Sequence, residues 1–171
     1  MRRRIAEPPR GVKAAEPDAI LAVMRVMALD VGDVRIGVAL SDETGTLASG
    51  LVTLKALGPR KDAQALAALA REHDVGEVVV GLPLRLDGST GSQAEKVMVF
   101  AERLRRVLRL PVVTRDERLT SVAADERLAE AGVKRRDRKA RIDQAAAALI
   151  LQEHLDERKA ATVAAGGGET A

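Results

Sequence analysis

The chain has 171 residues and contains no cysteine, tryptophan or tyrosine, one phenylalanine and two histidines. Without cysteine it can form neither disulfides nor thiolate metal sites, which fits a cytoplasmic protein. Its single phenylalanine ring argues against a module that holds single-stranded bases by stacking. Two histidines are too few for a histidine-rich zinc site, so a metal site would consist of carboxylates, which suit Mg²⁺ or Mn²⁺.

Long apolar stretches are missing as well. No apolar segment of signal-peptide length follows Arg2–Arg4, and no stretch is long enough to cross a membrane. Proline, glycine and scattered charges predict a flexible N-terminal extension over residues 1–24. The low-complexity end predicts a disordered tail over residues 159–171. Residues 25–158 are left as one folded domain, which suits a chain with 46% hydrophobic and 31% charged residues.

The apolar runs that are present alternate with turn signals and helical patterns. Val26–Leu29 and Ile36–Leu40 are short and apolar, and the Gly-containing turn between them predicts an antiparallel hairpin. A third strand follows by a tight turn, and each later strand is reached through a helix, so the later strands should lie parallel to the first. We therefore expect an α/β fold, a five-stranded mixed sheet with an antiparallel three-strand meander plus two parallel strands, covered by helices. The other predicted elements are strands at Ala48–Lys55, 78–80 and 111–114 and helices at 60–73, 92–108, 120–131 and 139–158.

Several acids stand where packing gives no reason for a charge. Asp30 ends the first strand, Asp116 and Glu117 end the last one, and Asp143 opens the final helix among apolar residues. Each has an ordinary explanation alone, as a turn residue or as an acid that complements a helix dipole. The first, fourth and fifth strands run in one direction, so their carboxyl ends share the sheet edge where ligands of open α/β sheets gather. Carboxylates converging there would be strongly destabilising unless divalent ions neutralised them.

A basic run enters the same final helix. Residues 134–141 read K-R-R-D-R-K-A-R, six basic residues against one acid, although the net charge of the chain is only +3. Such a run is usually a solvated face, but here it would lie beside the carboxylates. Acids that hold metal beside a basic rim suit phosphodiester cleavage by two metal ions. The basic residues are Lys134, Arg135, Arg136, Arg138, Lys139 and Arg141.

Four motifs contain these acids and the turns between them. They are D-V-G-D-V-R-I-G-V-A-L-S-D from Asp30 to Asp42, V-G-L-P with D-G-S between Val80 and Ser89, D-E-R-L-T from Asp116 to Thr120, and I-D-Q-A-A from Ile142 to Ala146.

In this order and spacing, the motifs resemble the YqgF/RuvX-like family, whose members are described as Holliday-junction-resolvase-like proteins and pre-16S rRNA nucleases. The resemblance covers about residues 25–156. It implies an RNase H-like fold, which agrees with the strand order above. It also implies a metal-dependent endonuclease that hydrolyses phosphodiester bonds in structured nucleic acid, either in pre-16S rRNA 5′ processing or in Holliday-junction resolution.

The resemblance implies roles for individual acids. Asp30, Glu117 and Asp143 match the family's metal ligands and would be the catalytic residues. Neighbouring side chains in a strand point to opposite faces, so only one of Asp116 and Glu117 can face the site directly, and Glu117 is the prediction. The sequence departs from the family's usual pattern at Asp33, which is either a fourth carboxylate near the metals or, as we favour, a turn residue.

The resemblance further implies contacts with nucleic acid. The loop over residues 81–89 would line the substrate groove, and the residue that departs from the family pattern in that loop, an arginine, would add a phosphate contact. The D-E-R-L-T motif would position phosphate or cap the following helix. The residues expected to contact nucleic acid, besides the basic run, are Arg35, Arg85, Arg118 and Thr120.

Two other functions are compatible with parts of the sequence. The hairpin pattern D-x-G-x-x-x-x-G-x-A also occurs in phosphotransferases of the actin and sugar-kinase type, but these need a second lobe for which this chain has no room. A non-catalytic nucleic-acid-binding factor in transcription or ribosome maturation could use the same groove. Neither His73 nor His154 is a strong candidate for a general base, because both are expected to be ordinary surface residues of helices. A junction resolvase would need two active sites and hence a homodimer.

Overall fold

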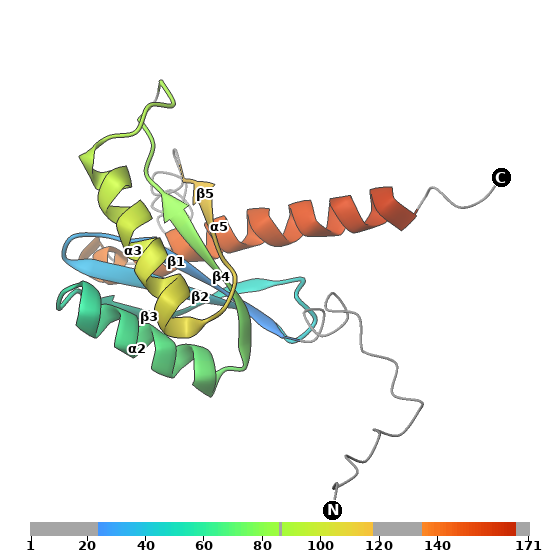
Figure 1. The fold of residues 1–171 in the computed structure, drawn as a ribbon, viewed down its shortest axis with the longest axis horizontal. Coiled ribbons are helices and arrows are strands. Elements are labelled where there is room, and N and C mark those ends of the chain that lie inside the picture. Colours follow the sequence, from blue (N-terminus) through green and yellow to red (C-terminus); the bar gives the residue numbers. More distant parts are fainter. Residues whose placement is uncertain (1–23, 86, 118–134, 167–171) are drawn as a thin grey trace, which may run out of the picture.

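A computed structural model of the chain describes residues 24–85, 87–117 and 135–166 (Figure 1). The helix predicted over residues 120–131 and the predicted contact residues Arg118, Thr120 and Lys134 lie outside these ranges. The elements are β1 (Arg25–Val31), β2 (Arg35–Ser41), β3 (Ala48–Lys55), α2 (Pro59–Glu72), β4 (Val75–Leu82), α3 (Ser92–Leu108), β5 (Val112–Asp116) and α5 (Arg135–Gly166).

The strands form one five-stranded sheet in the order β3-β2-β1-β4-β5. β2 is antiparallel to both β1 and β3, whereas β4 is parallel to both β1 and β5. The mixed sheet predicted from the sequence is therefore confirmed. Because β1, β4 and β5 run in one direction, their carboxyl-terminal ends lie at one edge. At that edge Asp30 of β1 is the ladder partner of Gly37 of β2.

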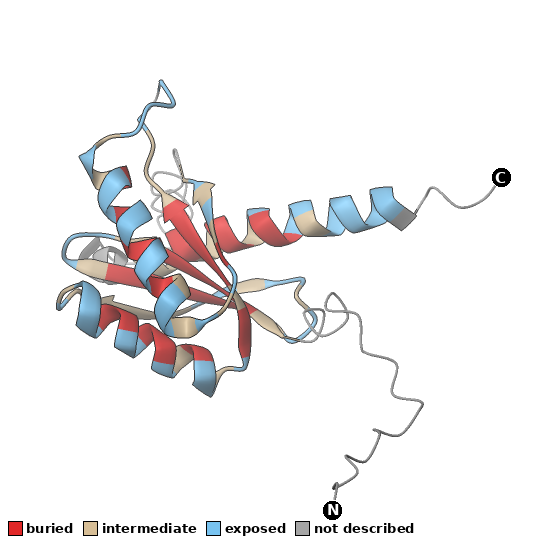
Figure 2. Ribbon diagram, viewed as in Figure 1, coloured by how far each residue is buried: buried red, intermediate tan, exposed pale blue. Residues whose placement is uncertain are grey.

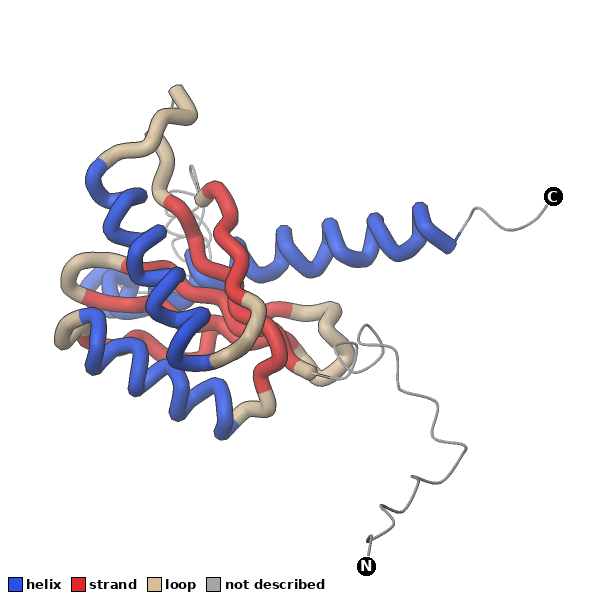
Figure 3. Tube along the Cα trace, viewed as in Figure 1, coloured by secondary structure: helices blue, strands red, loops and turns tan. Residues whose placement is uncertain are grey.

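Helices cover both faces of the sheet, with α2 and α3 on one side and α5 on the other (Figures 1 and 3). Side chains alternate between the two faces along each strand. In β1, Met27 and Leu29 belong to the apolar cluster under α2 and α3, whereas Val26 and Ala28 pack with residues of α5. Asp30 continues the second set, so the alternation carries its carboxylate to the α5 face.

α5 is 32 residues long, and its last turns, over residues 159–165, project away from the sheet with exposed side chains (Figure 2). The sequence predicts a helix that ends near Arg158 and a disordered tail from residue 159, but the helix continues to Gly166. The exposed segment K-A-A-T-V-A-A over residues 159–165 is rich in alanine, the strongest helix former. No helix within the described ranges is long and apolar enough to cross a membrane.

A charged cluster between β4 and α5 differs from the sequence predictions in two ways, in the length of β4 and in the burial of His154. β4 is longer than the strand predicted at 78–80, because Glu77 is accommodated inside it. One oxygen of Glu77 lies 3.0 Å from Nε2 of His154, and the other accepts a hydrogen bond from Arg158 at 2.7 Å. The hydrogen bond with His154 and the positive charge of Arg158 hold the pKa of Glu77 below its usual value. His154 is thus buried in this cluster, and the prediction that it is an ordinary surface residue is wrong.

We expect Gly37→Ala to destabilise the fold, because α5 crosses β2 at this residue. A Cβ atom at Gly37 would lie 2.0 Å from the backbone oxygen of Asp143, so the helix would have to move. The free energy of unfolding, measured by urea denaturation, should fall by at least about 3 kcal/mol, the upper end of the range for overpacking.

Gly45→Ala is the control for this substitution. Nothing lies within 4 Å of a Cβ atom there, and the cost is that of a left-handed backbone with φ 67°, about 1–2 kcal/mol. A Gly37→Ala protein as stable as the Gly45→Ala protein would show that the helix does not need this close approach.

Candidate active site

Three carboxylates from three elements meet at the carboxyl-terminal edge of the sheet, on the face covered by α5. Asp30 lies at the end of β1, Glu117 follows β5 directly, and Asp143 lies on α5. Glu117 forms a side-chain hydrogen bond with Asp30, and the negative charge of Asp143 acts on Asp30. The amide of Glu117 donates to the carbonyl of Leu82 at 3.2 Å, so strand pairing continues past β5 and holds Glu117 at this edge.

The surroundings of Asp30 and Glu117 favour their protonated forms. Burial and, next, the charge of Asp143 raise the pKa of Asp30 to about 6. Burial, the charge of Asp30 and the hydrogen bond between the two acids raise the pKa of Glu117 to about 8. The two acids titrate as a pair, and a proton shared in their hydrogen bond relieves their mutual repulsion. A cation placed between two such carboxylates would relieve the repulsion that the proton now relieves.

Two glycines make room for the acids. A Cβ atom at Gly81 of β4 would lie 2.2 Å from Oε2 of Glu117, and one at Gly37 of β2 would meet the backbone of Asp143. Both positions therefore have to lack a side chain for the acids to approach the sheet. The sequence reasoning missed this role, although a glycine in the interior of a strand is a signal of close approach.

Asp143 has a cationic partner that the sequence did not predict. Nε of Arg35, the first residue of β2, donates to Oδ2 of Asp143 at 2.6 Å. The Arg35 side chain is 36% exposed and that of Asp143 is 19% exposed. The pair joins residues 108 positions apart, so no local pattern indicates it. Arg35 was expected to line the substrate groove, and the structure places it on a carboxylate of the candidate site.

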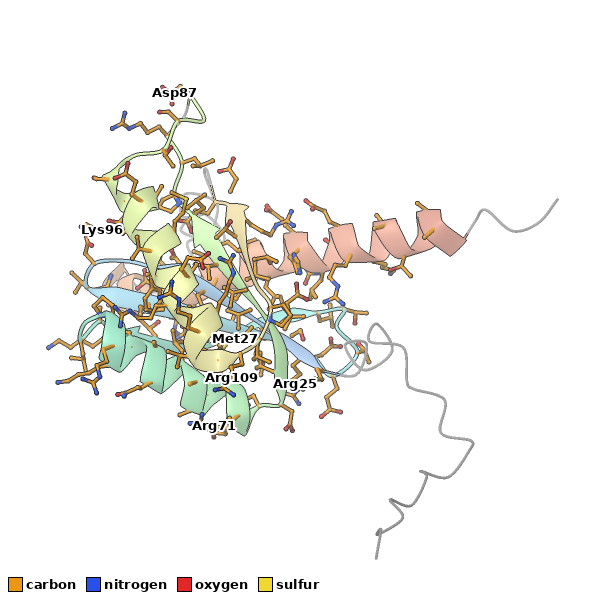
Figure 4. The ribbon with its side chains drawn as sticks, viewed as in Figure 1. Arg25, Met27, Arg71, Asp87, Lys96 and Arg109 are labelled. Atoms are coloured by element: carbon orange, nitrogen blue, oxygen red, sulfur yellow. The ribbon has the colours of Figure 1, made fainter. Side chains whose placement is uncertain are left out.

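Asp33 lies in the exposed turn between β1 and β2 and faces the other layer. Its Oδ1 accepts a hydrogen bond from Nζ of Lys96 at 3.2 Å, and Lys96, labelled in Figure 4, belongs to α3. Since α3 covers the face opposite to α5, Asp33 does not join the three acids. This placement fits the turn role that we favoured over a fourth site carboxylate.

The loop between β4 and α3 projects from the sheet, with Asp87 at its tip (Figure 4). Arg85 is exposed in this loop. The backbone amide and the hydroxyl of Ser89 both donate to Oδ1 of Asp87, at 2.9 and 2.6 Å, so local hydrogen bonds close the tip. Arg85 is thus presented to solvent at the end of β4, the strand that lies between those of Asp30 and Glu117.

The basic run begins α5, on the helix that carries Asp143. Arg141 is exposed, and the backbone of the preceding basic residues forms the first turns of the helix. At a rise of about 1.5 Å per residue, these turns lie within about 12 Å of Asp143 along the axis. The residues of the run in α5 are Arg135, Arg136, Arg138, Lys139 and Arg141.

An apolar cleft of about 610 Å³ lies on the other face of the sheet. Val31, Val97, Phe100 and Arg103 are among the residues that line it, and none of the three acids does. Asp33, Asp62 and Glu95 also line the cleft, but the described residues there include no group of acids that could hold a metal ion. The three acids at the sheet edge therefore belong to a separate site on the α5 face.

The donor set fits a hard divalent cation, although its arrangement is incomplete. Carboxylate oxygens are the ligands that Mg²⁺ and Mn²⁺ prefer. Among the residues that the structure describes, no three acidic or histidine side chains are already arranged to hold an ion. Asp30 and Glu117 are bonded to each other, whereas Asp143 is bonded to Arg35. A cation held by Asp30 and Glu117 would gain its third carboxylate once Asp143 turned from Arg35.

Comparison with known proteins identifies relatives along most of the chain. Residues 24–157 match the family model described as RuvX, Holliday junction resolvase. A relative from Thermoanaerobacter pseudethanolicus is 47% identical over 137 residues, which are 80% of this chain and 99% of the relative. A relative from Moorella thermoacetica is 51% identical over 133 residues, 78% of this chain and 95% of the relative. Both are named "Putative pre-16S rRNA nuclease".

Solved structures with the same fold are more distant in sequence. T. thermophilus RuvC in complex with a Holliday junction substrate has a TM-score of 0.53 at 14% identity, covering 80% of this chain and 96% of RuvC. The Fowlpox virus resolvase in complex with Holliday junction DNA has a TM-score of 0.50 at 12% identity, covering 79% and 99%. At these identities the likeness shows the fold alone, and it confirms the RNase H-like fold that the sequence implied. The family match and the full-length relatives show that the chain belongs to the RuvX family.

Proposed function

We propose that the protein is a divalent-metal-dependent endonuclease that hydrolyses phosphodiester bonds in structured nucleic acid and acts in the cytoplasm. The observation that supports it most is the convergence of Asp30, Glu117 and Asp143 at one sheet edge, where burial and mutual repulsion raise the pKa of the first two. Carboxylates buried against one another repel, and a cation bound between them would relieve that repulsion. The family match supports a hydrolytic nuclease.

The proposed roles follow from the positions of the side chains. Asp30, Glu117 and Asp143 would hold a Mg²⁺ or Mn²⁺ ion, and their partial burial would keep bulk water from competing for it. The chemistry that the ion would supply is activation of a water molecule and neutralisation of the charge that develops on the phosphate. No histidine serves as a general base in this proposal, because His154 is bonded to Glu77 in the separate cluster on β4.

Nucleic acid would approach across the α5 face at the same edge. The first turns of α5 carry the basic run, and Arg85 is exposed on the loop after β4. Such cations position a phosphate backbone without reading its sequence. Both a four-way DNA junction and the 5′ leader of a ribosomal RNA precursor present this backbone. Cleavage of a junction would further require a homodimer with two active sites, which measurement of the solution mass tests.

We expect Asp30→Asn to abolish cleavage without abolishing binding. The substitution removes one carboxylate charge from the site, and the rate of Mn²⁺-dependent cleavage should fall at least about 100-fold, equivalent to about 2.7 kcal/mol of transition-state stabilisation. Cleavage is measured on four-way junction DNA, single-stranded DNA, hairpin RNA and an RNA with the 5′ leader of pre-16S rRNA. Binding of the same probes is measured in EDTA and should change by less than about threefold.

Asp33→Asn is the matched control for Asp30→Asn. It removes the same charge three residues away, from a side chain that is 66% exposed and bonded to Lys96, and cleavage should persist. Equal cleavage by the wild type and Asp30→Asn would point to a contaminating nuclease. A wild type that cleaves none of the probes with Mg²⁺ or Mn²⁺ would refute the proposed activity and favour a non-catalytic binding factor.

We expect Glu117→Gln to stabilise the metal-free fold at alkaline pH. Because the pKa of Glu117 rises from 4.5 to about 8 on folding, the wild type loses stability as the pH increases through that window, whereas glutamine does not ionise. At pH 8 the free energy of unfolding should be roughly 1–3 kcal/mol higher in the variant, and the difference should vanish below pH 4.5.

Urea denaturation at several pH values in EDTA measures this difference. Glu153→Gln, at an exposed position of α5, is the control and should differ from the wild type by less than about 0.5 kcal/mol at every pH. A Glu117→Gln protein that is less stable than the wild type at pH 8 would show that ionisation of Glu117 does not lower the free energy of unfolding. Addition of Mn²⁺ should stabilise the wild type more than the variant.

A further inference from the structure

Arg35 stands between the solvent and one carboxylate of the candidate site. Its guanidinium donates to Asp143 at 2.6 Å, a charge-assisted hydrogen bond of the stronger kind. The residues that precede it in the turn, 32–34, are exposed, and 36% of its own side chain is accessible. The guanidinium can therefore be reached from the solvent without any change in the sheet.

The pairing withholds Asp143 from the other two acids. One of its oxygens is engaged by Arg35, while Asp30 and Glu117 are bonded to each other. No three acids among the described residues stand ready to hold an ion. Among the side chains that the structure describes, Arg35 is the cation bonded to Asp143, and a metal ion that recruits Asp143 has to compete with it.

A phosphate group is a suitable competitor for Arg35. The guanidinium offers several N–H donors in a planar fork that matches phosphate oxygens as well as it matches a carboxylate. The basic turns of α5 and the exposed Arg85 would bring the backbone of a nucleic acid to this edge. A phosphate that accepts the donors of Arg35 breaks the ion pair that this arginine forms with Asp143.

We propose that Arg35 is a positioning residue that couples nucleic-acid binding to metal binding. In the free protein Arg35 holds Asp143, and in the complex it moves to a substrate phosphate, which releases Asp143 to a divalent ion held by Asp30 and Glu117. The inference rests on the function proposed above. Binding linkage is reciprocal, so the nucleic acid tightens metal binding by the same factor by which the metal tightens nucleic-acid binding. The site would be completed mainly when a substrate is present.

A static role for Arg35 predicts different behaviour. If Arg35 remained on Asp143 in every state, Asp30 and Glu117 would hold the ion without the third acid. Loss of Arg35 would then remove a phosphate contact or loosen Asp143, and it would leave the linkage between metal and nucleic acid unchanged. The two roles are separated by binding measurements that do not depend on cleavage.

The first measurement is the affinity of the free, full-length protein for Mn²⁺, followed by the electron paramagnetic resonance signal of unbound Mn²⁺. Arg35→Gln should bind Mn²⁺ about tenfold more tightly than the wild type, because residue 35 no longer competes with the ion for Asp143. Arg35→Lys, which keeps the charge, should lie between them. Lys96→Gln removes the cation that pairs with Asp33 on the other face, and it should bind Mn²⁺ as the wild type does.

The second measurement is the linkage itself, determined by fluorescence anisotropy with labelled four-way junction DNA and hairpin RNA. Ca²⁺ replaces Mn²⁺ so that the probes are not consumed, and affinities are compared with those in EDTA. For the probe that the wild type cleaves, Ca²⁺ should tighten binding by about fivefold or more. In Arg35→Gln the factor should fall close to one, and in Lys96→Gln it should equal that of the wild type.

The outcomes distinguish the inference from the proposed function. A wild type that cleaves with Mn²⁺, together with an Arg35→Gln protein of unchanged Mn²⁺ affinity and unchanged linkage, overturns the role of Arg35 alone. Weaker Mn²⁺ binding in Arg35→Gln also overturns it and supports the static role. A wild type that neither binds Mn²⁺ nor cleaves overturns both. If Arg35→Gln binds Mn²⁺ more tightly and Ca²⁺ no longer tightens its binding of nucleic acid, the proposed move of Arg35 from Asp143 to a phosphate is established.

Discussion

The close packing of α5 on β2 is the constraint on which the site depends. Gly37 lies beneath the backbone of Asp143, and it is also the ladder partner of Asp30. One residue without a side chain therefore brings the helix down to the sheet at the same point of the ladder as the first carboxylate. Gly81 has the same role on β4, because its missing side chain leaves space for the carboxylate of Glu117. A side chain at either position would separate the acids, whatever their own conformations.

This arrangement opposes the ordinary preferences of a protein interior. Carboxylates are buried against one another, which favours their neutral forms and works against the folded state. Two apolar clusters, one on each face of the sheet, provide the stability that this site does not. The hydrogen bond between Asp30 and Glu117 and the ion pair of Asp143 with Arg35 reduce the repulsion locally. The metal ion that we propose would balance the same negative charge in a second way.

Much of this could be predicted from the sequence because it follows from local patterns and chirality. The hairpin, the two crossovers and the common direction of β1, β4 and β5 determine the sheet edge at which Asp30 and Glu117 lie. The pairs of Arg35 with Asp143 and of His154 with Glu77 were missed because they join residues 108 and 77 positions apart. The length of α5 was missed for another reason: the low complexity of the C-terminal segment predicted disorder, although its alanines favour a helix.

The cluster of His154, Glu77 and Arg158 affects the position of Asp143 along the axis of α5. Nη1 of Arg115 in β5 lies 3.3 Å from Nδ1 of His154, and Glu77 of β4 contacts the other ring nitrogen. Polar contacts from two strands therefore hold α5 at His154. His154 follows Asp143 by 11 residues, about 16 Å along the axis, and a slip of one turn would shift Asp143 by about 5.4 Å. Apolar packing alone tolerates sliding of a helix better than directional bonds do. The axial register of α5, and with it the reach of Asp143, is therefore set by a polar anchor remote from the acids.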